Sequence, residues 1–171
     1  MAEAGAAREV EVVRVTAENW RTYRDVRLAA LIDSPRAFWT TYAEAAGRTD
    51  EEWQRFPGQV LAWLALDGDR PAGTVGLWHA DDQPAEEVHL IGMWVPTDSR
   101  GTGVAERLVQ VALTQARADG RRRVLLDVAD EQVRAVAFYE RLGFRPTGGT
   151  GVMPWDETVT ERELALELTG P

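Results

Sequence analysis

Hydrophobic and polar positions alternate in short stretches of the chain, and this period of two predicts strands. Residues 10–15 read VEVVRV and predict the first strand. Residues 59–66 and 72–79 predict two more, which the turn DGDRP between them joins as a hairpin. Two further strands are predicted over residues 123–128 and 161–168.

The long strand predicted for residues 86–95 is apolar on both faces, a pattern typical of a central strand. One face is expected to carry Val88, Leu90 and Trp94. The other is expected to carry Ile91, Met93 and Val95. By the same alternation, Glu87 and His89 would share the face of Met93.

Apolar side chains recur at helical spacing in four other stretches. Residues 19–32 predict a helix that the sequence DSP ends, and residues 37–54 predict a second helix, interrupted near Gly47. Residues 103–118 and about 135–142 predict two more, which end at Gly120 and Gly143. The order is strand, two helices, three strands, helix, strand, helix and two strands, which predicts a mixed α/β domain.

A length of 171 residues suggests one domain, which we place at residues 10–171 after a disordered lead-in of residues 1–9. The N-terminal sequence MAEAGAAREVE lacks the features of a signal peptide, and no apolar run reaches the ~20 residues of a membrane span. We therefore expect a cytoplasmic protein with no membrane partner. The chain has no cysteine, which excludes disulfides, thiolate nucleophiles and Cys-ligated metals, and we expect no metal site.

The formal net charge is −9, and all 19 basic residues are arginines. Such acidity argues against a nucleic-acid-binding protein, which normally presents a basic face. The arginine run at residues 121–123 is interpreted as a solvated link between a helix and a strand, with a phosphate or partner patch as the alternative. An acidic field favours cationic substrates such as amines.

The stretch SRGTGVAERL, residues 99–108, follows the central strand and opens a predicted helix. It is not a phosphate-binding P-loop, because that motif needs a lysine and the chain has none. A dinucleotide-binding turn would need Gly or Ala where Glu106 stands, and a carboxylate there would repel a diphosphate. A helix N-terminus with small residues and Arg100 still offers backbone N–H groups and positive charge to an anion. An ordinary turn with no ligand is the alternative.

Together with the run AFYERLGF at residues 137–144, the pattern Arg-x-x-Gly-x-Ala at residues 100–105 resembles the GNAT family of N-acetyltransferases. The resemblance covers about residues 72–144, and LAALIDSPRAFWTTYAEAA and DEEWQRF are similar to a bacterial subgroup of mostly unassigned substrate. It implies a single-domain GNAT fold, with a central mixed, mainly antiparallel sheet of about seven strands, about four flanking helices and splayed central strands. It also implies acetyl-CoA as the co-substrate.

In this family, backbone groups of the strand before the loop bind the pantetheine arm, and one N–H faces the acetyl oxygen. The resemblance places that N–H at Met93 and neighbouring contacts at Trp94 and Val95. The expected diphosphate loop comprises Arg100, Gly101, Thr102, Gly103, Val104 and Ala105. Phe138 and Gln132 are further expected coenzyme contacts, and Gln132 stands where many relatives carry an asparagine.

The resemblance also suggests which residues move protons. Tyr139 corresponds to the family's tyrosine near the coenzyme sulfur, and a phenol pKa of about 10 suits it to protonate a departing thiolate. Packing within the apolar stripe of its helix is the alternative role. His89 matches the position of the catalytic glutamate of some relatives and would accept a proton directly or through water. Glu87, or a water chain without a single base, is the other candidate.

The acceptor site is expected between the first two helices and the last hairpin. Its candidate residues form an aromatic and acidic rim for a cation, with ordinary packing as the alternative: Trp39, Tyr42, Trp155 and Asp156. The sequence thus predicts an N-acetyltransferase that moves an acetyl group from acetyl-CoA to an amine of a small molecule or peptide, by direct attack in a ternary complex. A non-catalytic acyl-CoA-binding module and an acyltransferase with another acyl donor are the alternatives. The sequence is compatible with a monomer or a homodimer.

Overall fold

The computed structural model describes residues 9–169. The predicted lead-in, residues 1–9, lies almost entirely outside them. The strands are β1 (Glu11–Arg14), β2 (Leu61–Asp67), β3 (Arg70–Trp78), β4 (Glu87–Trp94), β5 (Arg123–Ala129), β6 (Arg145–Met153) and β7 (Asp156–Glu167). The α-helices are α1 (Trp20–Asp33), α2 (Tyr42–Ala46), α3 (Asp50–Arg55), α4 (Val104–Ala118) and α5 (Val133–Arg141). Short 3-10 turns, Pro35–Ala37, Phe56–Gly58 and Thr97–Ser99, lie between them.

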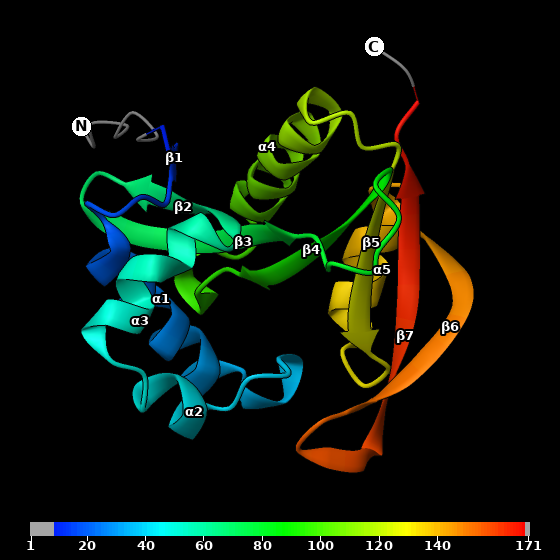
Figure 1. Ribbon diagram of the computed structural model, residues 1–171, viewed down its shortest axis with the longest axis horizontal. Helices are drawn as coiled ribbons and strands as arrows, with labels where there is room; N and C mark the ends of the chain where they lie inside the picture. The colour runs from blue at the N-terminus through cyan, green and yellow to red at the C-terminus, as the bar shows by residue number, and fades with distance from the viewer. Residues whose placement is uncertain (1–8, 170–171) are drawn as a thin grey trace, which may run out of the picture.

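All seven strands form one sheet in the order β1-β2-β3-β4-β5-β7-β6. Only β4 and β5 run parallel, and every other neighbouring pair is antiparallel. Helices α1, α2 and α3 lie on one side of the sheet, and α4 lies on the other (Figure 1). The predicted mixed, mainly antiparallel sheet is confirmed, with five α-helices in the described part rather than about four.

Each face of the sheet has its own hydrophobic core. Apolar residues of α4 and α5, such as Leu108 and Tyr139, pack with Val88, Leu90 and Leu126 of the central strands. On the opposite face, α1 packs with the α2–α3 segment and with β2. Burying both faces explains why β4 reads as an apolar run rather than as a simple alternation.

The predicted helix over residues 37–54 is two short helices, α2 and α3. Thr41 and Glu44 form a capping box at the start of α2, and Thr49 and Glu52 form another at the start of α3. Each box satisfies backbone N–H groups that a helix start leaves without partners, so the chain restarts the helix after Gly47. No helix among residues 9–169 is long and apolar enough to cross a membrane.

The predicted facing of β4 is wrong beyond Ile91, because the strand contains a bulge. Thr74 of β3 pairs with Trp94, and Gly76 of β3 pairs with Ile91. Between these two pairs β4 advances three residues and β3 only two, so β4 contains one extra residue. Gly92 has a φ of 60°, a conformation that a residue without a Cβ adopts freely. Met93 therefore packs on the α4 side with Val88, Leu90 and Val95, and Trp94 packs on the α1 side.

Candidate functional site

The sheet splits between its two parallel strands. β4 and β5 pair only at Glu87–Arg123, Val88–Val124 and His89–Leu125. Beyond these three pairs, β4 continues with β3 alone and β5 continues with β7 alone, and Figure 1 shows the two strands diverging. Each strand thus presents backbone N–H and C=O groups to the gap without a strand partner. Such an edge is suited to bind an extended ligand.

The loop before α4 begins close to the end of β4. Gly101 and Gly103 have φ values of 75° and 88°, and a Cβ built on either would meet nothing within 4 Å. Gly103 is the residue that precedes the first turn of α4, and the Gly103 carbonyl accepts the N–H of Arg107. The first backbone N–H groups of α4 have no carbonyl one turn earlier to bind, so they are available to an anion.

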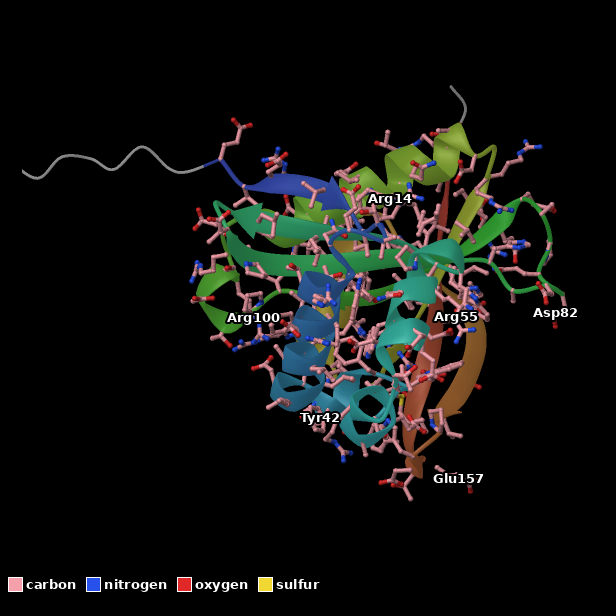
Figure 2. All side chains as sticks on the ribbon, turned by 60° about the vertical axis from the view of Figure 1, so that its left-hand side comes forward. Arg14, Tyr42, Arg55, Asp82, Arg100 and Glu157 are labelled. Atoms are coloured by element: carbon pink, nitrogen blue, oxygen red, sulfur yellow. The ribbon has the colours of Figure 1, made fainter. Side chains whose placement is uncertain are left out.

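Arg100 joins this loop to α1. Its Nε donates to the carbonyl of Val95 at 2.9 Å, and its Nη2 donates to Asp33 Oδ2 at 2.8 Å. The Trp94 indole donates to the same carboxylate oxygen at 3.0 Å. Hydrogen bonds from Trp94, Ser34 and Arg100 lower the pKa of Asp33. Figure 2 shows Arg100 beside α1. The Arg100 guanidinium is already paired with Asp33 and the Val95 carbonyl. An anion at this loop would therefore be bound mainly by the backbone N–H groups of the loop.

Tyr139 and Met93 both contact the core on the α4–α5 side. The Tyr139 side chain is buried, with its ring edge-to-face with Phe138 at 5.2 Å and with Phe144 at 5.6 Å. Burial raises the pKa of Tyr139 above its usual value, so the hydroxyl keeps its proton at neutral pH. Gln132 is the residue before the first turn of α5, and its side chain makes no capping hydrogen bond there.

His89 lies on the other face of β4, opposite Met93. The bulge at Gly92 causes this, so the expectation that Glu87, His89 and Met93 share a face is wrong. The Gln83 amide nitrogen lies 2.9 Å from His89 Nδ1, and the Gln83 amide oxygen accepts the N–H of Ala80. Gln83 therefore donates to Nδ1, and the proton of a neutral His89 ring is on Nε2.

The Nε2 atom of His89 lies 3.8 Å from Asp127 Oδ2 on β5, across the split. Burial lowers the pKa of His89, and the charges of Glu163 and Glu87 partly oppose that shift. Burial, with the negative charge of Glu163, raises the pKa of Asp127. The two shifts bring the pKa values of His89 and Asp127 closer together, and the raised pKa makes the Asp127 carboxylate a better proton acceptor than an ordinary aspartate.

Glu87, the other candidate base, is an ion-paired residue. Arg123 Nη1 lies 3.2 Å from the Glu87 carboxylate, and Arg123 Nε lies 2.9 Å from Glu167. Glu87 and Arg123 stand side by side in the register of β4 and β5, at the closed end of the split. His89 lies nearer to the open part of the split than Glu87 does.

Three acidic side chains that we did not select from the sequence gather on this face. Asp127 and Glu163 are directly opposite in the register of β5 and β7, and Glu161 is opposite Ala129. Glu161 is only 5% exposed, and burial raises its pKa. The one signal for Asp127 in the sequence is an acid in the middle of an otherwise apolar strand. Nothing in the sequence brings β7 beside β5.

One of the four rim candidates, Trp39, contacts this acidic group directly. The Trp39 indole donates to Glu161 Oε2 at 2.8 Å, and the Trp155 indole donates to the carbonyl of Phe38 at 2.8 Å. Tyr42 is 45% exposed on α2, and Figure 2 places it at the lower edge of the molecule. Asp156 accepts the backbone N–H and the hydroxyl of Thr158, so it shapes the β6–β7 turn.

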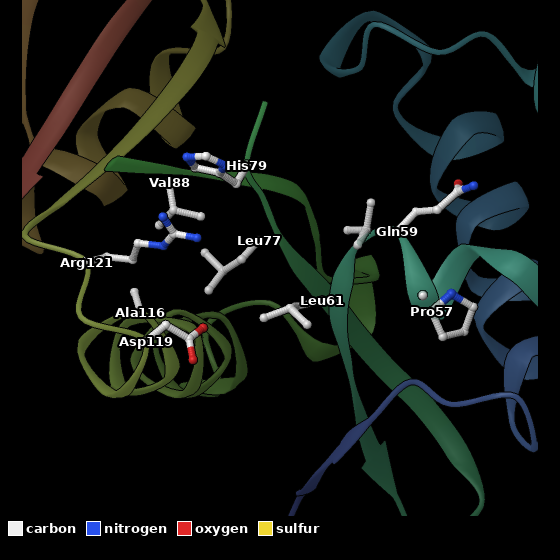
Figure 3. A pocket seen from close by; sticks show the side chains of 11 residues that line it. Pro57, Gln59, Leu61, Leu77, His79, Val88, Ala116, Asp119 and Arg121 are labelled. Atoms are coloured by element: carbon white, nitrogen blue, oxygen red, sulfur yellow. The ribbon is translucent and has the colours of Figure 1, made fainter. Parts of the chain in front are cut away.

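Two pockets help to delimit the site. One of about 460 Å³ adjoins the acidic face and is lined by Asp130, Thr150, Gly151, Val152, Thr160 and Glu161. A smaller one of about 150 Å³ includes Leu77, Ala116 and Arg121 and lies by the C-terminal end of α4 (Figure 3). The loop at Gly103 lies at the N-terminal end of that helix, so the smaller pocket is outside the candidate site.

The sequence and the fold were compared with known proteins. Residues 17–144 match the family described as the acetyltransferase (GNAT) family. N-acetyltransferase 8B of Homo sapiens is 33% identical over 128 residues, which are 71% of this chain and 56% of that protein. Mycothiol acetyltransferase of Geodermatophilus obscurus is 36% identical over 104 residues, which are 57% of this chain and 32% of that protein. The chain therefore spans about half or less of the curated relatives it matches.

Solved structures of similar fold cover nearly the whole chain. The structure of yncA from Salmonella typhimurium, solved with its cofactor acetyl-CoA, has a TM-score of 0.75 at 13% identity and covers 95% of this chain and 96% of its own. A GCN5-related N-acetyltransferase from Kribbella flavida has a TM-score of 0.73 at 21% identity, with 93% and 98% covered. The family match and the split sheet agree: this chain belongs to the GNAT family of acetyltransferases.

Proposed function

We propose that the protein is an N-acetyltransferase that moves the acetyl group of acetyl-CoA to an amine by direct attack. The observation that carries the proposal is the split between β4 and β5, with an anion-binding loop on one face and the His89–Asp127 pair on the other. A thioester that enters from the loop side would meet an amine from the acidic side.

The residues present fit acetyl-CoA. The two left-handed glycines of the loop leave open space where a Cβ would stand, so a diphosphate can approach the N–H groups of Gly103, Val104 and Ala105. Arg100 holds the loop against the end of β4 by donating to the Val95 carbonyl, so its role is partly structural. The backbone from Met93 to Val95, which lies beyond the last β4–β5 pair, is the proposed partner of the pantetheine amides, with the Val95 carbonyl also accepting from Arg100.

The proposed reaction forms a C–N bond between the amine and the thioester carbonyl and breaks the C–S bond. The Met93 N–H is assigned to the carbonyl oxygen, on which negative charge develops. The ammonium group loses one proton before its nitrogen attacks and a second from the tetrahedral adduct, and the His89–Asp127 pair accepts them in turn, directly or through water, and passes them to solvent. Tyr139 donates its proton to the departing sulfur and regains one from solvent. The products are an acetamide and coenzyme A with a free thiol.

The acidic residues on the acceptor side would attract a positively charged amine. Asp127, Glu161 and Glu163 place negative charge around the proposed acceptor position, which attracts an ammonium group. Trp39 provides an aromatic face beside Glu161, whereas the guanidinium of Arg36 already lies 5.2 Å over the ring of Trp155. Asp156 and Tyr42 are less suited to the role, since Asp156 is engaged in its own turn and Tyr42 points to solvent.

The test is calorimetric titration with acetyl-CoA, followed by measurement of thiol release with a panel of amines. Saturable binding together with amine-dependent thiol release is the expected result. No binding at high micromolar acetyl-CoA would end the proposal. Binding without turnover of any amine would instead favour a non-catalytic acyl-CoA-binding module.

A further inference from the structure

Arg27 of α1 carries a charge for which the described residues provide no carboxylate partner. Its Nη1 atom is buried and has no hydrogen-bond partner among residues 9–169. The guanidinium carbon lies 4.9 Å over the ring of Phe38. Burial lowers the pKa of Arg27, which reflects the cost of holding this cation out of water. A buried charge is ordinarily paired, so Arg27 is arranged to meet an anion from outside the chain.

The position of Arg27 indicates where that anion would lie. The Nη1 atom is 3.4 Å from the point where a Cβ of Gly92 would stand, so the guanidinium abuts the bulge of β4. Gly92 directly precedes Met93, whose N–H we assign to the thioester oxygen. Consecutive Cα atoms are about 3.8 Å apart, so the Arg27 guanidinium abuts the residue next to the assigned oxyanion donor.

Arg27 lies on the acceptor side of the sheet. α1 and Phe38 belong to the core on that face, whereas Met93 and Tyr139 belong to the opposite one. Phe38 connects Arg27 to the acidic group, because its carbonyl accepts the Trp155 indole and the next residue, Trp39, donates to Glu161. The acceptor side of the sheet thus carries a cation beside the bulge of β4 and carboxylates on β5 and β7.

We propose that Arg27 binds the carboxylate of the acceptor and that the acceptor is an α-amino acid. This rests on the proposed acetyl transfer. In an α-amino acid one carbon separates the amine from the carboxylate, so a carboxylate held by Arg27 beside Gly92 keeps the amine near Met93. The α-amine attacks the thioester carbonyl, the C–S bond breaks, and the protons that the amine loses go to the His89–Asp127 pair. The products are an N-acetyl amino acid and coenzyme A.

The same cation would repel a polyamine at this point, although the surrounding acidic residues would attract one. A carboxylate from the acyl donor, as in succinyl-CoA, could also reach a guanidinium beside Gly92. The acceptor is favoured because the Arg27 guanidinium lies over Phe38, which packs with Trp94 in the core on the acceptor side of the sheet. The two sources of a carboxylate are separable by varying the acceptor and the donor independently.

The experiment measures kcat/KM with acetyl-CoA for L-amino acids and for their C-terminal amides, which differ only in the carboxylate. The wild-type protein is expected to prefer the acids by about 10-fold or more, since a charge-assisted hydrogen bond contributes about 1.5 kcal/mol or more. Arg27→Met removes the guanidinium and keeps an unbranched apolar side chain, and it is expected to abolish the preference without changing the affinity for acetyl-CoA. Arg27→Lys is expected to restore part of it. Thermal unfolding and calorimetry with acetyl-CoA verify that both variants are folded.

Equal turnover of acids and amides by the wild type would overturn the assignment and leave the acetyltransferase proposal intact. So would a preference that survives in Arg27→Met, or faster turnover of polyamines than of amino acids. A loss in Arg27→Met of selectivity between succinyl-CoA and acetyl-CoA, with acceptor preference unchanged, would place the carboxylate on the donor and refute the acceptor site. No thiol release with any amine would refute the proposed function itself.

Discussion

Tyr139→Phe removes one oxygen from the centre of the proposed chemistry. The hydroxyl makes no hydrogen bond to another residue among 9–169, and the ring contacts with Phe138 and Phe144 remain in the variant. The free energy of unfolding should therefore change by less than about 1 kcal/mol. General acid catalysis is typically worth 100-fold or more, so we expect kcat to fall by about 100-fold, or about 2.7 kcal/mol of activation free energy.

The assay is initial-rate thiol release with acetyl-CoA and a competent amine, together with calorimetric measurement of acetyl-CoA affinity. Tyr23→Phe is the matched control, because Tyr23 is also buried, has its pKa raised to about 12, and packs on Phe56 in the opposite core. It should leave kcat within about twofold. Wild-type kcat in Tyr139→Phe, or equal losses in both variants, would remove Tyr139 from the mechanism.

Three further predictions concern protonation, the loop and the core. Because burial lowers the pKa of His89, the neutral ring exists at neutral pH, and kcat/KM should fall only as the pH drops below about 6.5. His89→Ala should lower activity and remove that limb, and an unaltered pH–rate profile would contradict this. Gly103→Ala should raise the acetyl-CoA Kd by about 10-fold at a cost of roughly 1–2 kcal/mol in stability, because a Cβ is disfavoured at a φ of 88°; unchanged affinity by calorimetry would exclude the loop. Phe144→Ala should lower the unfolding free energy by about 3–5 kcal/mol in denaturant titration, since the ring is fully buried, and a loss under 1 kcal/mol would show that the core is misassigned.

The sequence was sufficient for features that depend on local pattern. The long apolar run of β4 indicated a central strand, and the loop at residues 99–105 with the helix after it was placed correctly. The bulge in β4 was missed, although a single glycine inside a strand pattern is its usual signal. The bulge at Gly92 reverses the faces on which Met93 and Trp94 lie. As a result, His89, the predicted base, and Met93, the predicted oxyanion donor, lie on opposite faces of the sheet.

The parts of the site that depend on tertiary contacts could not be predicted. Asp33 and Arg100 are 67 residues apart, and their pairing follows from how α1 crosses the end of β4. Asp127 and Glu163 meet only because β7 inserts between β5 and β6. Arg27 reads in the sequence as one of several arginines on an amphipathic helix, and only the packed structure shows it without an acid.

In the proposed mechanism, the split between β4 and β5 brings acetyl-CoA and an amine together for direct transfer. The most direct measurement incubates the protein with acetyl-CoA and an amine and follows the free thiol and the acetylated product by mass spectrometry. One free thiol is expected for each acetamide formed, and only slow hydrolysis of acetyl-CoA is expected when the amine is omitted. Saturable coenzyme binding with no acetamide from any amine would contradict this mechanism.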